Sequence, residues 1–341
     1  MERLLIGERS EIQIGRGLVL GDILPARPGR EKVAVLTQPG ARHIADLLLK
    51  VASPGWVGQM MLPDGDTAKT LAVAQTVYEW LAEMGVGRHD TIVGVGGGSV
   101  TDVAGFVAGT YLRGVEVVHV PTTLLGAVDA AIGGKTGVNL GGKNLVGVFH
   151  HPSRVVIDLD VLDALPVELK REGLAEALKA GLIADLELFS RIESAGLEAD
   201  LDVVVPRAVA VKVAVVNEDF REKGLRAILN YGHTIGHAVE IVAGIPHGHA
   251  VAIGMAAAGR IAESLVGFAD AERQHNAISG LGLPVATEGL DRRLVREVLA
   301  QDKKRDAAGL RMVLLRTIGE PVVLSVPRVA IDVGLAGIGI T

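Results

Sequence analysis

Residues Thr91–Asp102 read TIVGVGGGSVTD and predict the fold of the first half of the chain. The apolar run Thr91–Val95 predicts a buried strand, the glycines Gly96–Gly98 a tight turn, and Ser99–Ala108 a helix. At such a junction the backbone N–H groups and the helix dipole favour an anion, and glycine lets a phosphate approach closely. The fingerprint G-x-G-x-x-G is not met, because Ser99 stands where its last glycine belongs. The segment indicates either a nucleotide site of another α/β type or a simple glycine-rich turn.

Strands and helices alternate on both sides of this junction, which indicates a parallel sheet. Further strands are predicted at Lys32–Thr37, Met60–Pro63, Glu116–Val120 and Val155–Asp158, and a helix at Thr67–Met84. After about Pro166 the periodicity becomes helical, and a weak two-strand signal, MVLLRTIGEPVVL, follows near the end. The helical segments are Glu168–Ile192, Val203–Val216, His233–Ala243 and Val251–Leu265. We therefore expect an α/β domain over residues 1–160 and a mainly α-helical domain over residues 161–341.

The composition excludes several classes of protein. A length of 341 residues suggests about two domains of ~150 residues. A net charge of −6 and an aromatic content of 3% argue against a general nucleic-acid binder. The absence of cysteine excludes disulfides, thiolate metal sites and cysteine nucleophiles, so a metal would need His, Asp or Glu. No apolar run of about 18 residues indicates a membrane span, and MERLLIGERS lacks the apolar core of a signal peptide. A cytoplasmic location is expected.

Four of the ten histidines lie between residues 233 and 249. His233 and His237 stand four residues apart on one predicted helix, so spacing alone favours them as joint zinc ligands. His247 and His249 follow after a turn. The alternative is a histidine pair on a helix surface. A carboxylate ligand should come from a neighbouring helix, and the candidates are Glu172 and Glu176.

The loop GGKTGVNLGGKN, residues 133–144, sets two lysines among glycines in an otherwise acidic chain. Such a loop suits a phosphate or carboxylate ligand, although a solvated surface loop is the alternative. The cluster Asp302–Arg305 is interpreted as a solvated turn. Other polar residues stand in mostly apolar company or just before the histidines, namely Arg113, Asp129, Lys212, Arg226 and Asn230.

Several motifs occur together in one order between Asp64 and Gly319. They are GGGSVTD (96–102), TYLRG (110–114), PTTLL (121–125) followed by Asp129 and Lys135, GKN (142–144), AEALK (175–179), Lys212 followed by RAILNYGHTIGHA (226–238), and HGHAVAIGM (247–255). In this order the chain resembles the 3-dehydroquinate synthase family of sugar phosphate cyclases. The motifs are many and separate, so the resemblance is highly specific.

The resemblance implies a Rossmann-like N-terminal domain that holds NAD and a C-terminal helical domain that holds Zn²⁺ or Co²⁺, with the active site in the cleft between them. It implies Glu176, His233 and His247 as the metal ligands and moves His237 to the substrate side, in place of the pair that spacing favours. It also implies a homodimer in which Arg113 is shared across the interface.

The remaining site residues follow from the same resemblance. The substrate phosphate would meet Lys135, Asn144, Lys179 and Arg113, and the hydroxyls and carboxylate would meet Asp129, Lys212, Arg226, Asn230 and one of Lys303 and Lys304. NAD would contact Asp64, Asp66, Lys69, Gly98, Ser99, Val100, Thr101, Asp102, Thr122, Thr123, Lys135, Lys143, Val161, Leu162, Asp163 and Ala164.

The implied reaction converts 3-deoxy-D-arabino-heptulosonate 7-phosphate to 3-dehydroquinate and phosphate. A hydroxyl is oxidised by NAD, phosphate leaves, the hydride returns, and an intramolecular aldol step closes the ring, so NAD is regenerated. Three positions depart from the family pattern: the loop from Lys135 to Lys143 is one residue short, Asp66 replaces a common Glu, and His249 stands where Glu or Ala is usual.

Three other readings compete. Related cyclases make 2-deoxy-scyllo-inosose or valiolone-type products, but Arg226 and Asn230 favour a substrate with a carboxylate. A metal-dependent glycerol or alcohol dehydrogenase shares the GGGS segment and the two-domain plan, yet it eliminates no phosphate and has no need of GGKTG, GKN or RAILNYGH. A nucleotide-binding protein without activity is the third alternative.

Overall fold

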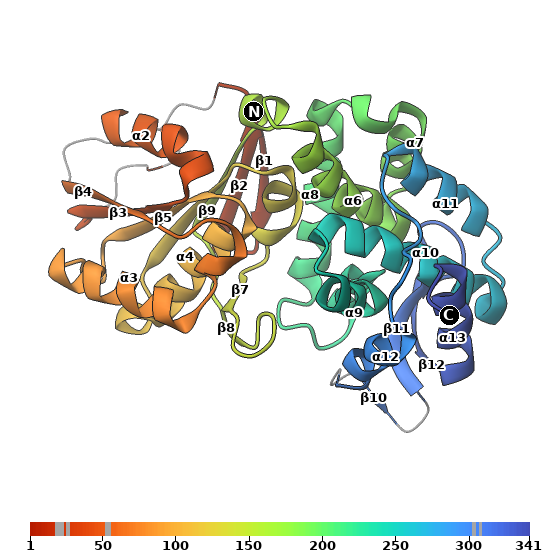
Figure 1. Ribbon diagram of the computed structural model, residues 1–341. Coiled ribbons are helices and arrows are strands. Elements are labelled where there is room, and N and C mark those ends of the chain that lie inside the picture. Colours follow the sequence, from red (N-terminus) through yellow and green to blue (C-terminus); the bar gives the residue numbers. More distant parts are fainter. Residues whose placement is uncertain (18–23, 25–27, 52–55, 302–304, 307–308) are drawn as a thin grey trace. The chain divides into compact units, whose positions relative to one another are not determined.

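The structure is a computed structural model that describes residues 1–17, 24, 28–51, 56–301, 305–306 and 309–341 (Figure 1). It forms two compact units, Met1–Leu165 and Pro166–Thr341, and each is described here by itself. The expected bounds of the two domains, residues 1–160 and 161–341, and the functions expected of them remain predictions. No helix of the described residues has the length and apolar character that crossing a membrane requires.

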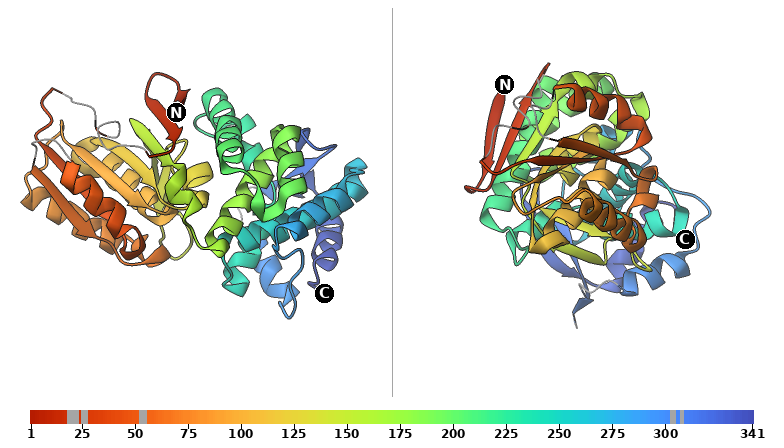
Figure 2. Two further views of the ribbon diagram at one scale, coloured as in Figure 1. Left: turned by 90° about the horizontal axis from the view of Figure 1, so that it is seen from above. Right: turned by 90° about the vertical axis from the view of Figure 1, so that its left-hand side faces the viewer.

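The first unit is built on a seven-stranded sheet of order β1-β2-β9-β6-β5-β3-β4. All neighbouring strands are parallel except β1 and β2, which form an antiparallel hairpin at one edge (Figures 1 and 2). The predicted α/β class with a parallel sheet is therefore confirmed. The strands are β1 (Glu2–Ile6), β2 (Ser10–Gly15), β3 (Lys32–Thr37), β4 (Trp56–Met61), β5 (Thr91–Gly96), β6 (Glu116–Pro121) and β9 (Arg154–Asp158).

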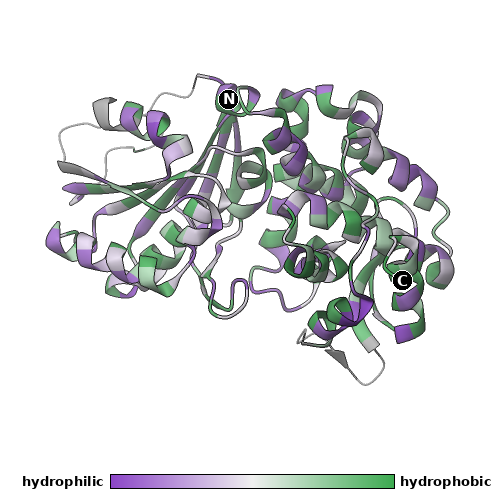
Figure 3. Ribbon diagram, viewed as in Figure 1, coloured by the Kyte–Doolittle hydropathy of each residue, from purple (hydrophilic) through white to green (hydrophobic). Residues whose placement is uncertain are grey.

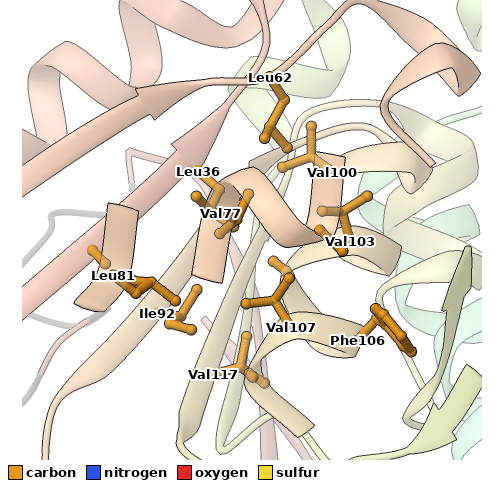
Figure 4. Close-up of a cluster of buried hydrophobic side chains, with 14 of the residues drawn as sticks. Leu36, Leu62, Val77, Leu81, Ile92, Val100, Val103, Phe106, Val107 and Val117 are labelled. Carbon is orange, nitrogen blue, oxygen red and sulfur yellow. The ribbon is translucent and has the colours of Figure 1, made fainter. Parts of the chain in front are cut away.

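Helices cover both faces of this sheet because its central strands are apolar on both sides. On one face Leu36, Ile92 and Val117 pack against two helices, α3 (Leu71–Glu83) and α4 (Gly98–Thr110) (Figure 4). On the other face a valine-rich cluster packs against Ala41, in the 3₁₀ turn before α2, and Ala45 of α2. The remaining elements are α2 (Arg42–Val51), α5 (Leu159–Asp163), a π-helix at Gly126–Ala130, 3₁₀ turns at Pro39–Ala41, Gly65–Ala68 and Tyr111–Arg113, and an antiparallel hairpin of β7 (Lys135–Val138) and β8 (Val146–Phe149).

Asp90 ties the start of β3 to the turn before β5. Its carboxylate accepts backbone N–H groups of Glu31 at 3.0 Å, Lys32 at 2.8 Å and Gly87 at 2.7 Å. Burial would raise the pKa of Asp90, but these three donors hold it below its ordinary value.

We expect Asp90→Asn to destabilise the first unit by about 1–3 kcal/mol at pH 7, because an amide cannot accept all three N–H groups. A depressed carboxyl pKa gives stability that is full above the unfolded value of about 3.9 and is lost as pH falls through the folded value. The difference between the variant and the parent should therefore shrink in acid. Urea unfolding followed by tryptophan fluorescence tests this, since both tryptophans, Trp56 and Trp80, belong to this unit. Equal stability at pH 7 would contradict it.

The second unit is mainly helical, as expected. Its helices are α6 (Val167–Ala184), α7 (Leu186–Ala195), α8 (Leu201–Glu218), α9 (His233–Ala243), α10 (His247–Val266), α11 (Ala271–Gly280), α12 (Arg292–Gln301) and α13 (Arg328–Gly337), with 3₁₀ turns at Gly196–Glu198 and Leu225–Asn230. A small antiparallel sheet of β10 (Arg305–Asp306), β11 (Gly309–Leu315) and β12 (Pro321–Val326) contains the predicted two-strand signal. In Figure 3, α11 is mostly hydrophilic and α9 is more hydrophobic.

The predicted helix over Glu168–Ile192 is in fact two helices. Asp185 separates α6 from α7, and its carboxylate accepts the N–H of Leu188 at 3.0 Å as an N-cap. The same carboxylate pairs with Arg207 of α8 at 2.8 Å. Periodicity continues through Asp185, so only the capping interaction reveals the break.

Candidate functional site

Three potential metal ligands converge in the second unit from three different helices. Glu176 lies on α6, His233 begins α9 and His247 begins α10. The Oε1 atom of Glu176 lies 3.5 Å from the Nε2 atom of each histidine, and the three ligand atoms lie within 4.8 Å of one another. One carboxylate oxygen and two imidazole nitrogens form a donor set that suits zinc or cobalt.

The second nitrogen of each ring has a partner that fixes its tautomer. His233 Nδ1 lies 3.2 Å from the carbonyl oxygen of Tyr231, and His247 Nδ1 lies 3.3 Å from Oε2 of Glu240. Both partners are acceptors, so each Nδ1 carries a proton, and Nε2 is the ring nitrogen of each histidine that is available to bind a metal beside Glu176. Tyr231 is itself anchored, because its hydroxyl donates to Gln274 at 2.6 Å.

The charges around Glu176 also suit a bound cation. Glu176 is only 3% exposed, it pairs with the buried Lys179, and among the described residues its oxygens have no hydrogen bond of ordinary geometry. Burial would raise the pKa of Glu176, but Lys179 and the two histidines hold it well below its ordinary value. A buried ionised carboxylate without full hydrogen bonding is costly, and a divalent ion would supply the missing partner.

The histidines differ in their protonation. Burial and the nearby Lys179 ammonium hold the pKa of His233 well below its ordinary value. Burial would also lower the pKa of His247, but its contacts with Glu176 and Glu240 raise it to about 10. A metal ion must therefore displace a proton from His247, so metal affinity should fall as the pH falls.

Glycines allow the three helices to approach closely enough for this convergence. A Cβ on Gly254 of α10 would lie 1.9 Å from the carbonyl oxygen of Gly232, and one on Gly248 would lie 2.6 Å from Cα of Glu172 on α6. Gly232, just before His233, has φ +77°, a conformation that favours glycine. The backbones of α9 and α6 thus touch α10 directly, which places the ligands next to one another.

His237 lies beside the group but is not one of the three ligands that include Glu176. Its ring centroid is 5.0 Å from that of His233 and 5.9 Å from that of His247. The side chain is exposed, and it forms a second possible ligand group with Glu240 and His247. The pair that spacing favours, His233 and His237, is thus not the pair that the buried carboxylate meets.

Other predicted residues of this unit lie on the segments before α9. Lys212 on α8 and Arg226 are buried, and Arg226 donates to the carbonyl of Phe220 at 2.6 Å. Asn230 donates to Glu222 at 2.7 Å, and Glu222 has an unusual φ of +54°. Lys303 and Lys304 lie outside the described residues. Sequence analysis missed Glu222 and Glu240, although Glu240 falls seven residues after His233 on the same helical face.

In the first unit, α4 begins with a glycine cradle. Gly97 is its N-cap, and among the described residues no side chain caps this end. A Cβ on Gly97 would lie 3.2 Å from Cγ2 of Thr123, and one on Gly98 would lie 3.1 Å from Cβ of Ala130. Ser99 is half-buried, and the N-terminal N–H groups of this helix are suited to a phosphate group. Val100, Thr101 and Thr122 are buried around the cradle.

The segment Asp64–Lys69 is joined to this cradle by an ion pair. The buried Lys69 donates to Asp102 of α4 at 2.6 Å and lies 3.9 Å from Asp66. Burial raises the pKa of Asp102 in spite of Lys69, and the negative charges of Asp129 and Asp66 add to this. Asp129 sits in the π-helix, a distortion that is common at functional sites.

The shortened loop also reaches this segment. Asn139 donates to Asp66 at 3.1 Å and accepts the backbone N–H of Asn144 at 2.9 Å. Asn144 has φ +53° and, like Lys135 and Lys143, is exposed.

The remaining residues of the first unit that were expected at the substrate or at NAD are Arg113 and residues 161–164. Arg113 is exposed, with φ +67°. Val161, Leu162 and Asp163 end α5 and Ala164 caps it, and Asp163 pairs with Arg16 at 2.7 Å.

Comparison with known proteins gives consistent results over most of the chain. The family profile described as 3-dehydroquinate synthase N-terminal matches residues 59–172, and the one described as 3-dehydroquinate synthase C-terminal matches residues 173–305. A 3-dehydroquinate synthase from Mycolicibacterium gilvum is 46% identical over 324 residues, 90% of this chain and 89% of that one. One from Paenarthrobacter aurescens is 41% identical over 337 residues, 94% of this chain and 92% of that one.

Solved structures of sugar phosphate cyclases resemble the chain over nearly its full length. A 2-deoxy-scyllo-inosose synthase complexed with carbaglucose-6-phosphate, NAD⁺ and Co²⁺ has a TM-score of 0.87 and 28% identity, covering 98% of this chain and 99% of that one. A 2-epi-5-epi-valiolone synthase from Streptomyces hygroscopicus with NAD⁺ and Zn²⁺ bound has a TM-score of 0.87 and 28% identity over 96% of each chain. A probable glycerol dehydrogenase from Sinorhizobium meliloti, with a TM-score of 0.61 and 20% identity over 98% of each chain, shares the fold alone.

Proposed function

The chain belongs to the 3-dehydroquinate synthase family, and on that premise we propose that it converts 3-deoxy-D-arabino-heptulosonate 7-phosphate to 3-dehydroquinate and phosphate. The observation that carries the proposal is the ligand group of the buried Glu176 and His233 with the partly buried His247, in a chain that shares 46% identity with a relative of that name. A related cyclase of the 2-deoxy-scyllo-inosose or valiolone type is the alternative, because structures of both kinds share the fold at 28% identity.

We propose NAD and a divalent metal, zinc or cobalt, as the cofactors. The cyclase structures that share this fold contain NAD⁺ with Co²⁺ or Zn²⁺. Glu176, His233 and His247 would hold the metal, which when bound supplies a Lewis acid for hydroxyl and carbonyl oxygens. For NAD, the start of α4 at Gly98 and Ser99, which no side chain of the described residues caps, suits the pyrophosphate. The Lys69–Asp102 pair, with the segment that begins at Asp64, would complete the NAD site of the first unit.

The chain's own cations and amides account for the remaining chemistry. Lys179, buried beside Glu176, is placed to neutralise an anionic group near the metal ligands. Arg226 is held by the backbone of Phe220 and suits a carboxylate, while Asn230, held by Glu222, suits a hydroxyl or a carboxylate oxygen. Their fixed positions would orient the substrate and limit its competing reactions. The same proposal includes six further residues at the substrate. Its phosphate would contact Lys135, Asn144 and Arg113, and its hydroxyls would contact Asp129, Lys212 and His237.

Phosphate release tests the proposal directly. With NAD and Zn²⁺ or Co²⁺ present, we expect the protein to release phosphate from the heptulosonate phosphate and to accumulate no NADH. Treatment with EDTA should stop the release, and added Zn²⁺ should restore it. Phosphorylated sugars that lack the carboxylate serve as the matched comparison, and we expect them to react at least about 100-fold more slowly because the contact between Arg226 and the substrate carboxylate would be lost.

Each alternative gives a different result in the same assay. Faster reaction of a sugar phosphate without a carboxylate would favour one of the related cyclases. Net NADH without phosphate release would favour a dehydrogenase. The homodimer that shares Arg113 is part of the proposal, and the molecular mass in solution tests it.

A further inference from the structure

Glu240 is a buried carboxylate in a position that is unfavourable by itself. It is 5% exposed and lies in the last turn of α9, four residues before the cap residue Gly244. The negative end of the helix dipole is at this terminus, so a carboxylate is destabilised there. Burial adds to this unless the charge has a partner. A carboxylate at this end of a helix conflicts with its local surroundings, which points to a functional reason for its presence.

The contact between Glu240 and the ring of His247 indicates what that reason is. Its Nδ1 atom lies 3.3 Å from Oε2 of Glu240, while its Nε2 atom lies 3.5 Å from Oε1 of Glu176. The imidazole is thus held at both nitrogens, by carboxylates from two different helices. The connection is short, because Gly244, with φ +64°, ends α9 and His247 begins α10 three residues later.

We propose that Glu240 is a positioning residue for the metal site: it accepts the Nδ1 proton of His247 and so keeps Nε2 as the nitrogen that faces Glu176 and would bind the metal. The inference rests on the metal site of the proposed function and extends it by one residue. His233 has an equivalent arrangement, in which the carbonyl of Tyr231 accepts its Nδ1 proton. The ion would then be bound by two histidines of the same tautomer, each oriented by an acceptor behind it.

A second arrangement is possible in principle, because His237, Glu240 and His247 also bring three ligand atoms within 4.8 Å of one another. In that arrangement Glu240 would be a ligand itself, and the metal would bind Nδ1 of His247. The geometry favours the first arrangement, since it uses the buried Glu176 and the buried His233, whereas the second depends on the exposed side chain of His237.

The first test measures metal affinity in the full-length protein without substrate. We expect Glu240→Gln to weaken Zn²⁺ binding about 10- to 100-fold in competition with a chelator, and to alter the visible spectrum of the Co²⁺ form. The neutral amide keeps the shape of the side chain but is a weaker acceptor. Glu263→Gln is the matched control, because Glu263 lies on α10 with its side chain 57% exposed and pairs only loosely with Arg260, at 3.5 Å. The control should bind both metals as the parent does.

His237→Ala separates the two arrangements. We expect it to retain the metal within about threefold of the parent, because His237 is not a ligand in the first arrangement. Loss of metal in His237→Ala together with retention in His233→Ala would show that Glu240 is a ligand, and would overturn the proposal. Parent-like Zn²⁺ affinity in Glu240→Gln would overturn it as well.

A measurement on the parent protein decides the matter even if the Glu240 variant fails to fold. In ¹⁵N-histidine NMR spectra of the Zn²⁺ form, we expect His233 and His247 both to be protonated at Nδ1 and metal-bound at Nε2. Metal on Nδ1 of His247 would refute the inference. These readouts need no turnover, so absence of phosphate release with normal metal binding would count against the proposed reaction and leave the role of Glu240 intact.

Discussion

Glu176→Gln is expected to lose the bound metal and to lower kcat/KM for phosphate release by about 10³-fold or more. Glu176 is the anionic member of its ligand group, and Lys179 lies buried against it. A neutral amide binds a divalent ion more weakly, and it removes the negative charge beside the buried Lys179 ammonium. Loss of several kcal/mol of Lewis-acid stabilisation corresponds to a thousandfold or more in rate. Metal analysis after dialysis, together with steady-state kinetics, measures both effects.

Glu193→Gln is a matched control for this variant. Glu193 lies on α7 of the same unit and pairs with Arg273 at 2.6 Å, but both side chains are partly exposed. Exposed ion pairs of this kind contribute at most about 1 kcal/mol, so metal content and rate should be unchanged. If Glu176→Gln kept a full complement of metal and a parent-like rate, the assignment of this carboxylate as a ligand would be wrong.

The fold of the first unit was largely predictable because its signals are local. The run Thr91–Gly96 is buried at every position, and the turn that follows needs glycine, so strand, turn and helix could all be expected from one stretch. The hairpin of β1 and β2 was missed, since β1 is mostly exposed and lacks such a run. An edge strand depends on its neighbour for pairing, which leaves little trace in its own residues.

The candidate metal site was less predictable from the spacing of residues in the sequence, for a reason that concerns helix packing. Periodicity shows that His233 and His237 share a face of α9, but it does not show which neighbouring helix that face meets. Glu176 on α6 and His247 on α10 join His233 only because α10 packs closely on both other helices. The family resemblance indicated all three residues, which their spacing in the sequence could not. Neither approach indicated Glu240, because its contact with His247 depends on where α10 begins.

That close packing makes Gly254→Ala the most damaging small substitution that we expect in the second unit. A Cβ at this position would lie 1.9 Å from the carbonyl oxygen of Gly232 and 2.7 Å from the backbone nitrogen of Gly236. Backbone atoms cannot rotate away as a side chain can, so α9 and α10 must separate. Overpacking of a core costs about 1–3 kcal/mol and occasionally more, and a clash with backbone belongs at the upper end, about 3 kcal/mol.

The same separation should move His233 away from His247, since each begins one of the two helices. We therefore expect Zn²⁺ affinity to fall about tenfold or more together with stability, because a ligand set tolerates little displacement. Hydrogen exchange followed by mass spectrometry would show faster exchange in peptides of α9 and α10. Gly280→Ala is the matched control, because a Cβ there meets nothing within 4 Å and its φ is not positive. It should be neutral or stabilising by up to about 1 kcal/mol. If both variants behaved alike, close contact between these helices would not be what holds the two histidines together.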